Sequence, residues 1–204
     1  MDITFAELSP GQVYFNMIQT IIPRPIAWVL TGNADGSCNL APFSYFTAVC
    51  SEPPLIMLSI GKKSDGSQKD TATNIEARRD FVVHIAHREM LEALNSSSAS
   101  LPAGESEVEM LGLKTVPFGS FSLPRLESAR IAYACSLYET KIIGAGAQTI
   151  VFAEVKHLYV DDAFIIYDRK GRARVDVKSL DPIARLGADE YAFLGDVVRL
   201  KRPD

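Results

Sequence analysis

The hydrophobic residues of the chain lie mainly in short runs that alternate with polar residues or are nearly continuous, and both patterns are typical of β-strands. The runs at 131–143 and 149–160 are long and are separated by Gly144-Ala145-Gly146, so we expect them to form a hairpin. The apolar positions of the second run do not alternate perfectly, which predicts a β-bulge. Further strands are expected in shorter apolar runs at 26–30, 55–60, 81–86, 164–167 and 197–200.

One apolar run, SCNLAPFSYF at 37–46, fits neither the period of a helix nor that of a half-buried strand. Pro42 would break a helix, and the apolar residues are too continuous for a strand with one wet face. The preceding segment, TGNADGSCN at 31–39, is rich in turn-forming residues, so the run is expected to return beside 26–30. A core strand and a wall for a flat heteroaromatic ligand both have this composition. In the second case the polar edge of the ligand would meet Asn39, Ser44 and Thr47.

Helical signals are fewer. Helices are expected at 69–79, 87–97, 106–112 and 181–187. The polar stretch SSSASLPAG at 96–104 predicts a mobile surface loop within an excursion that spans about 87–122. Many strands with few helices favour a β-barrel or a sandwich, and the chain lacks the GxGxxG and P-loop motifs of nucleotide-binding α/β folds. A chain of 204 residues without a clear linker is expected to form one domain, 1–204.

Composition narrows the classes of partner. The formal net charge is −4, which argues against a nucleic-acid-binding face. The longest apolar runs fall far short of the ~20 residues that span a bilayer, and the N-terminal residues lack the basic start and apolar run of a signal peptide. Cys38, Cys50 and Cys135 are widely spaced, so we expect reduced thiols in a cytoplasmic protein and no zinc site.

The segment KDTATN at 69–74 is the best local candidate for an anion site, because it opens a helix and carries a lysine and short polar side chains. The alternative is that Asp70 is simply an N-cap and the rest is solvated. Arg24 stands between two prolines just before a strand, so it could support an anion site from a stiff segment. An exposed arginine at the entrance of a strand is the alternative.

No acid–base or nucleophile constellation is visible. His84, His87 and His157 do not have the spacing of metal ligands, so we expect satisfied or exposed histidines and no metal site. Glu105, Glu107 and Glu109 alternate along a short segment and are expected to form a solvated edge. No catalytic residue can be assigned, and an enzyme without such groups often relies on a cofactor.

The order of the motifs adds a resemblance that covers about residues 10–195. The segments at 23–61 (PRPIAWVLTG to PPLIMLSIG), 69–85 (KDTATNIEARRDFVVHI), 91–117, 124–139, 152–162 and 180–192 (LDPIARLGADEYA) follow one another as in a known family. The chain closely resembles the flavin reductase-like, FMN-binding split-barrel family, which is related to flavoredoxin. The resemblance implies a mainly β fold with a few helices, built as a split β-barrel.

The resemblance also implies a homodimer with one FMN per subunit near the interface. The activity it implies is a flavin reductase: hydride passes from NAD(P)H to N5 of the flavin, and electrons then leave to a small-molecule or protein acceptor. Two alternatives remain open. The protein could be a non-enzymatic FMN electron carrier of the flavoredoxin type, or a split-barrel module for another flat ligand such as haem.

Site residues are implied by position in the matched motifs. The isoalloxazine and ribityl chain would contact Asn39, Leu40, Ala41, Pro42, Ser44, Tyr45 and Phe46, with Leu40 and Phe43 also serving packing. Ser59, Ile60 and Gly61 would pass close to the flavin or its phosphate tail. The phosphate end would be formed by Lys69, Asp70, Thr71 and Asn74, assisted by Arg24. Arg185 and Gly187 would lie near the flavin, and Ala188 follows where a second glycine is commoner in the family.

Overall fold

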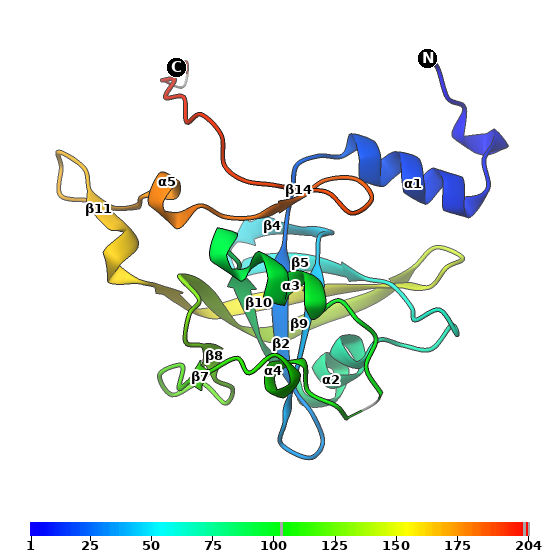
Figure 1. Cartoon of the computed structure of the whole chain (residues 1–204), viewed down its shortest axis with the longest axis horizontal. Helices are drawn as coiled ribbons and strands as arrows, with labels where there is room; N and C mark the ends of the chain where they lie inside the picture. Colours follow the sequence, from blue (N-terminus) through cyan, green and yellow to red (C-terminus); the bar gives the residue numbers. More distant parts are fainter. Residues whose placement is uncertain (103, 202, 204) are drawn as a thin grey trace.

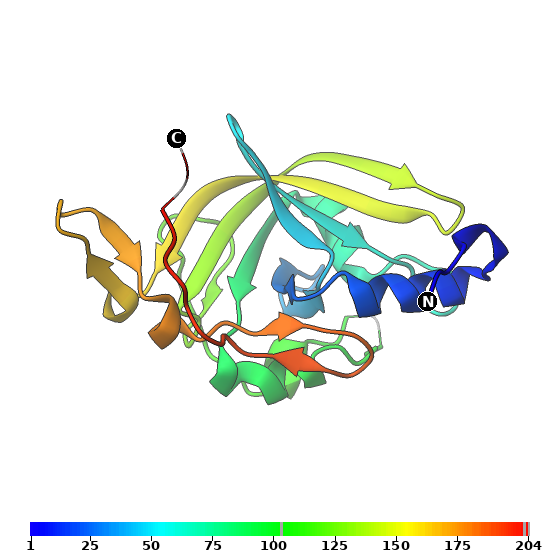
Figure 2. The ribbon, with the colours of Figure 1, turned by 90° about the horizontal axis from the view of Figure 1, so that it is seen from above.

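The computed structural model describes residues 1–102, 104–201 and 203, and its centre is a seven-stranded antiparallel sheet (Figure 1). The strand order is β3-β2-β6-β9-β10-β5-β4. The sheet is curled rather than flat (Figure 2), as in an open barrel. Its strands are β2 (Ala27–Gly32), β3 (Cys38–Phe43), β4 (Phe46–Ser51), β5 (Pro54–Ile60), β6 (Asp80–Ile85), β9 (Ile131–Ile143) and β10 (Gln148–Val160).

Smaller elements surround this sheet. Three short strands, β1 (Arg24–Pro25), β13 (Ala184–Arg185) and β14 (Tyr191–Ala192), form a second sheet. Two-stranded sheets are formed by β7 (Thr115–Val116) with β8 (Arg125–Leu126) and by β11 (Ile165–Tyr167) with β12 (Ala173–Val175). The α-helices are α1 (Pro10–Thr20), α2 (Asp70–Arg78), α3 (Leu91–Ser96), α4 (Glu107–Met110) and α5 (Val177–Leu180). Short 3-10 helices lie at Phe5–Glu7, Arg88–Met90 and Asp162–Phe164.

The sequence-based strand predictions are largely confirmed. The β2–β3 and β9–β10 pairs are antiparallel hairpins, as expected. The predicted irregularity in β10 is present twice, because the register against β9 shifts between Phe152 and Ala153 and again between Val155 and His157. The sequence therefore forms the mainly β, split-barrel fold that the resemblance implies.

The two faces of the sheet explain why its strands are so continuously apolar. Trp28 and Leu30 point into a core between the sheet and the 87–122 excursion. Val29, one position along the same strand, points into a second core inside the barrel. Strand β6 divides in the same way, with Val82 on the first side and Val83 on the second. A strand buried on both faces loses the alternation of a half-exposed strand.

Three predictions about elements are wrong. Residues 197–200 form no strand. The stretch 181–187 is not a helix, because the Ile183 N–H donates to the Ala86 carbonyl and Ala184–Arg185 pairs with β1. The run at 37–46 is divided between two strands, with Ser44 and Tyr45 at the turn that separates β3 from β4. At 181–187, pairing with distant segments overrides the local preference for a helix.

The loop at 96–104 is not entirely a surface loop. Ser97 is buried, and its hydroxyl accepts a hydrogen bond from Nε1 of Trp28 at 2.8 Å. The same hydroxyl donates to the Leu94 carbonyl, so the end of α3 is held against the barrel. Ala103, also within this predicted loop, lies outside the described residues.

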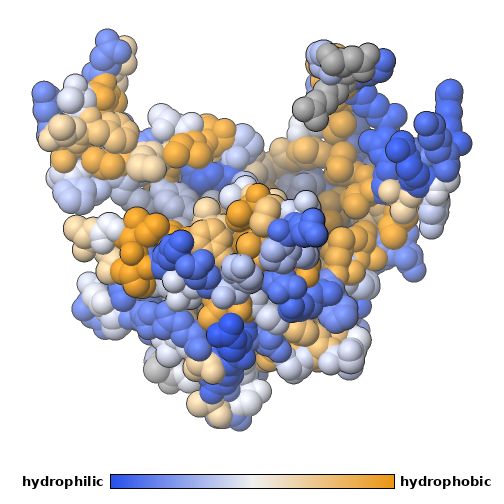
Figure 3. Space-filling view, turned by 180° about the vertical axis from the view of Figure 1, so that it is seen from behind, coloured by the Kyte–Doolittle hydropathy of each residue, from blue (hydrophilic) through white to orange (hydrophobic). Residues whose placement is uncertain are grey.

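Helix α1 was missed in the sequence, although its start carries a recognisable signal. Ser9 and Gln12 form a capping box, and Pro10 occupies the first helical position. None of the residues of α1 is buried, and Tyr14 and Phe15 are each more than half exposed. The N-terminal segment with α1 and the C-terminal segment project from the barrel (Figure 1). Figure 3 shows hydrophobic side chains on both. No element among the described residues covers this surface of α1.

The cysteines and the helices bear on the compartment predictions. Cys38, Cys50 and Cys135 are all free, as expected. Among the described residues, no helix combines the length and the apolar character that crossing a bilayer requires.

A test of backbone strain is available at Ala188. Its φ of 47° lies in the left-handed region, which costs a residue with a Cβ about 1 kcal/mol. Ala188→Gly is therefore expected to raise the free energy of unfolding by about 1 kcal/mol, measured by urea denaturation. Ala192→Gly in β14 is the matched control and is expected to lower stability by about 0.5–1 kcal/mol. Equal changes in the two variants would contradict the strain argument.

Candidate functional site

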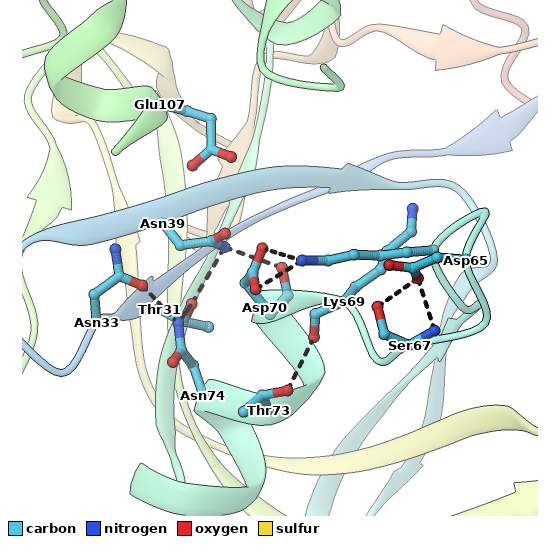
Figure 4. A network of polar contacts seen from close by, with 12 residues as sticks. Thr31, Asn33, Asn39, Asp65, Ser67, Lys69, Asp70, Thr73, Asn74 and Glu107 are labelled. Carbon is cyan, nitrogen blue, oxygen red and sulfur yellow. Dashed lines mark hydrogen bonds and ion pairs between the residues drawn. The ribbon is translucent and has the colours of Figure 1, made fainter. Parts of the chain in front are cut away.

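A buried polar network joins the β2–β3 hairpin to α2 (Figure 4). Nδ2 of Asn39 donates to the hydroxyls of Thr71 at 3.0 Å and Thr31 at 3.3 Å. Nδ2 of Asn74 donates to Thr31 at 3.1 Å and to the side-chain oxygen of Asn33 at 2.9 Å. All but Asn33 are buried, so each unmade bond would be costly. The network thereby fixes the start of α2 against β3.

The N-terminus of α2 has no side-chain cap. Lys69 occupies the N-cap position without a capping hydrogen bond, and Asp70 is the first helical residue. Asp70 instead pairs with the Nζ of Lys63 at 3.0 Å. The alternative that Asp70 is an N-cap is therefore wrong. The Ala72 N–H donates to the Lys69 carbonyl, so the N–H groups of Asp70 and Thr71 are the ones left for an anionic ligand.

Lys69 is the cation at this helix start. Its Nζ lies 5.4 Å from the centroid of the Phe43 ring, and within the described part of the chain it forms no ion pair. Burial lowers the pKa of its ammonium group. A desolvated cation without a carboxylate partner is a favourable place for a charge-assisted bond to an anion.

Three cavities meet at Pro42. The first, about 80 Å³, lies between β3, the start of α2, residues 97–101 and Glu107 of α4. The second, about 150 Å³, is bordered by Ser44, Arg185 and Tyr191 among others. The third, about 650 Å³, lies between α1 and the barrel. Because each is lined in part by Pro42, they suit an elongated ligand with an anionic end at α2.

Most of the predicted site residues border these cavities. They are Asn39, Ala41, Pro42, Ser44, Tyr45, Ser59, Gly61, Lys69, Asp70, Thr71 and Arg185. The side chains of Leu40 and Ile60 lie in the two cores, as does most of Phe43, and Phe46 packs against the barrel core. Leu40 and Phe43 thus serve packing, as expected. Asn74 contributes through the polar network.

Arg24 does not lie at the candidate phosphate end of the site, where the sequence-based prediction placed it with Lys69 and Thr71. It is buried, so the alternative of an exposed surface arginine is wrong. Its guanidinium donates to the carbonyls of Ile18 at 2.6 Å, Ile21 at 2.7 Å and Leu186 at 2.7 Å, and to the hydroxyl of Ser44 at 3.3 Å. These bonds tie the end of α1, the β3–β4 turn and the C-terminal segment together. Arg24 is not among the residues that line the cavity at α2.

Glu107 is a site residue that the sequence did not reveal. It was expected on a solvated edge with Glu105 and Glu109, but its side chain is only 5% exposed and borders the cavity at α2. Its Oε2 accepts from the Leu40 N–H at 2.8 Å. Glu105 and Glu109 are exposed, as predicted. Alternating charges cannot show which of them turns inward when the helix is only one turn long.

Lys63 was also missed, and Tyr191, within the matched segment 180–192, was left without an assigned role. Lys63 reaches the cavity at α2 from the loop before the helix. Tyr191 lies 4.4 Å from the guanidinium carbon of Arg185 by its ring centroid, and its hydroxyl donates to Asn95 at 2.9 Å. No metal-binding group of three or more His, Cys, Asp or Glu side chains occurs in the described ranges.

Comparison with known proteins identifies the family of this site. A family model described as "Flavin reductase like domain" matches residues 19–176. The chain belongs to this family. It is 38% identical, over 96% of its length and 93% of the relative, to an uncharacterized protein of Halalkalibacterium halodurans.

Solved structures agree with the flavin reductase-like assignment. Nitrilotriacetate monooxygenase component B from Bacillus cereus superposes with a TM-score of 0.89 at 33% identity, covering 98% of both chains. The 2-nitrobenzoate 2-nitroreductase of Pseudomonas fluorescens superposes with a TM-score of 0.88 at 30% identity, covering 100% of this chain and 96% of that one. The resemblance noted in the sequence is thus confirmed.

Proposed function

We propose that this flavin reductase-like protein binds FMN along β3 and acts as an oxidoreductase, taking electrons from NAD(P)H and passing them to a small-molecule or protein acceptor. The observation that carries the proposal is Lys69, a largely buried cation at the uncapped start of α2 that forms no ion pair with any residue the structure describes. Lys69 borders two of the three cavities that share Pro42, the one at α2 and the one under α1. A ligand with a terminal phosphate and a flat apolar body matches that arrangement.

Each segment would then have a distinct role. Lys69, Thr71 and the first N–H groups of α2 would hold the phosphate through charge-assisted bonds. Ala41 and Pro42 would follow the ribityl chain, and the ring would lie toward Ser44 and Arg185. Bound FMN supplies the redox chemistry, while these residues position it and exclude water. The cavity under α1 leaves room for a second substrate beside the ring.

Two solved structures that resemble this chain support a redox role. Both are redox proteins by name, one a monooxygenase component and the other a nitroreductase, and each is at least 30% identical to this chain. The part of the chain that the structure describes offers no nucleophile–base pair in these cavities, which agrees with chemistry supplied by a cofactor.

We further propose that two copies of the chain form a homodimer in the cytoplasm. Helix α1 buries none of its residues in its own chain, and Tyr14, Phe15 and Ile21 expose more than half of their surface. Exposed apolar surface of this kind is typical of a subunit interface. Free cysteines are typical of a reducing compartment. Light scattering of the purified protein should give twice the chain mass; a monomer at micromolar concentration would contradict the dimer.

The proposed function is tested by spectroscopy. Purified protein, supplied with FMN, should show the visible absorption of a bound flavin after gel filtration. Anaerobic addition of NADH or NADPH should bleach that absorption rapidly. Bleaching by dithionite alone would favour the electron carrier over the reductase. A protein that retains no FMN would exclude both functions.

A further inference from the structure

Glu107 holds two parts of the structure together. β3 is an edge strand of the main sheet, so one row of its backbone groups faces away from the other strands. Helix α4 meets that row: Glu107 accepts from the Leu40 N–H at 2.8 Å, and the Ser106 hydroxyl donates to the Cys38 carbonyl at 2.5 Å. The excursion is therefore fastened to the strand that lines the candidate flavin groove.

The carboxyl group of Glu107 also borders the cavity at α2, where the phosphate of FMN is proposed to bind. Figure 4 shows Glu107 reaching from α4 toward the side on which Asn39 and Asp70 lie. Lys63 and Lys69 face this cavity from the loop and helix start opposite, and Asp70 adds a carboxylate there. The other ionisable groups nearby are Glu105 and Glu109, next to α4 and within it, and the thiol of Cys38 on β3. A carboxylate in a cavity suited to phosphate requires an explanation, because like charges repel.

We propose that Glu107 binds a proton from solvent when the phosphate of FMN occupies this cavity, and that the resulting carboxylic acid donates a hydrogen bond to a phosphate oxygen. The inference rests on the proposed FMN function and names a further binding residue for it. The second carboxyl oxygen would continue to accept from Leu40, so the fastening of α4 to β3 is kept in both states.

The surroundings favour this protonation. Burial raises the pKa of Glu107, and the Asp70 carboxylate raises it further, while the Leu40 N–H and the Lys63 ammonium lower it. A phosphate dianion in the same cavity would add a stronger raising influence than Asp70. A neutral carboxylic acid can donate a hydrogen bond to phosphate, which a carboxylate cannot.

The test compares FMN binding by the full-length protein at several pH values. The dissociation constant of wild-type protein, followed by quenching of FMN fluorescence, should rise by about tenfold between about pH 7 and pH 9, where the phosphate is already a dianion. Glu107→Gln keeps an acceptor for Leu40 and a neutral donor, so its dissociation constant should be nearly independent of pH and lower than wild type at the upper end. Calorimetry of the wild type near pH 8 in two buffers of different ionisation enthalpy should show uptake of about half a proton per FMN, which is the average that a tenfold change over two pH units requires.

Two controls separate the possible failures. Glu109→Gln removes a carboxylate from the same helix at an exposed position and should behave as wild type. Riboflavin, which lacks the phosphate, should bind wild type and Glu107→Gln equally.

If FMN binds without proton uptake, or if Glu107→Gln keeps the wild-type pH dependence, the inference is wrong although the proposed function stands. If FMN does not bind at all, both are wrong. Absence of proton uptake by the wild type would overturn the inference even if the variant does not fold.

Discussion

Replacing Lys69 and Thr71 together by alanine is expected to weaken FMN binding by about 100-fold, since a charge-assisted hydrogen bond contributes about 1.5–3 kcal/mol and each 1.4 kcal/mol is about a tenfold change in affinity. Lys69 would lose its ammonium group, which has no other charged partner among the described residues. The Thr71 change also removes an acceptor of Asn39, which loosens the junction of β3 with α2.

The affinity should be measured by titrating each protein into FMN and following the quenching of flavin fluorescence. The matched control combines Thr73→Ala, an exposed position of the same helix, with Lys114→Ala, an exposed lysine elsewhere. Its affinity should equal that of the wild type. Riboflavin, which lacks the phosphate, should lose much less affinity than FMN in the double variant, because only the loosened junction of β3 with α2 affects it. Unchanged FMN affinity in the double variant would contradict the proposal that the phosphate of FMN binds at the start of α2.

The strands were largely predictable because the central part of this sheet, such as β2 and β6, is buried on both sides. Runs such as 131–143 are apolar over many residues and end in glycine-rich turns, so their bounds could be placed from sequence alone. The same burial hid the division of 37–46 into β3 and β4. When a run of residues is apolar throughout, its sequence does not show where one strand ends and the next begins.

The site was predictable where its residues are adjacent in sequence. Lys69 and Thr71 belong to one helix start, and the local motif carries the chemistry. Glu107 and Lys63 enter the same cavity from other segments, and nothing in their own neighbours predicts this. The role of Arg24 was equally hidden, because its guanidinium joins backbone carbonyls of two segments that are far from each other in sequence, at Ile18 and Leu186. Contacts of this kind depend on tertiary structure rather than on motif.

Lowering the pH from about 7 to about 4 is expected to cost the folded protein about 3 kcal/mol through His84 alone, at 1.36 kcal/mol per pKa unit. His84 is fully buried, and burial lowers its pKa from 6.5 to about 4. Its neutral ring is satisfied, because Nδ1 bonds to the Trp28 carbonyl at 3.1 Å and Nε2 accepts from the Leu126 N–H at 3.0 Å. This is the satisfied core histidine that the sequence predicted.

The sign follows from proton binding. Below about pH 6.5 the unfolded chain protonates this histidine while the folded chain does not, so stability is lost as the pH falls and the loss is complete near pH 4. Burial lowers the pKa of His87 in the same direction, and carboxylates add their own dependence, so the comparison must be between variants.

Urea denaturation of the flavin-free protein at several pH values isolates the contribution of His84. His84→Gln should be less stable than wild type at neutral pH, because glutamine cannot reproduce both ring contacts in a packed core. Its stability should nevertheless fall by about 3 kcal/mol less than that of the wild type between about pH 7 and pH 4, since the titrating group is gone. His157→Gln, at an exposed position, serves as the matched control and should retain the wild-type slope. Parallel pH profiles for His84→Gln and wild type would show that the buried ring is not what limits stability in acid.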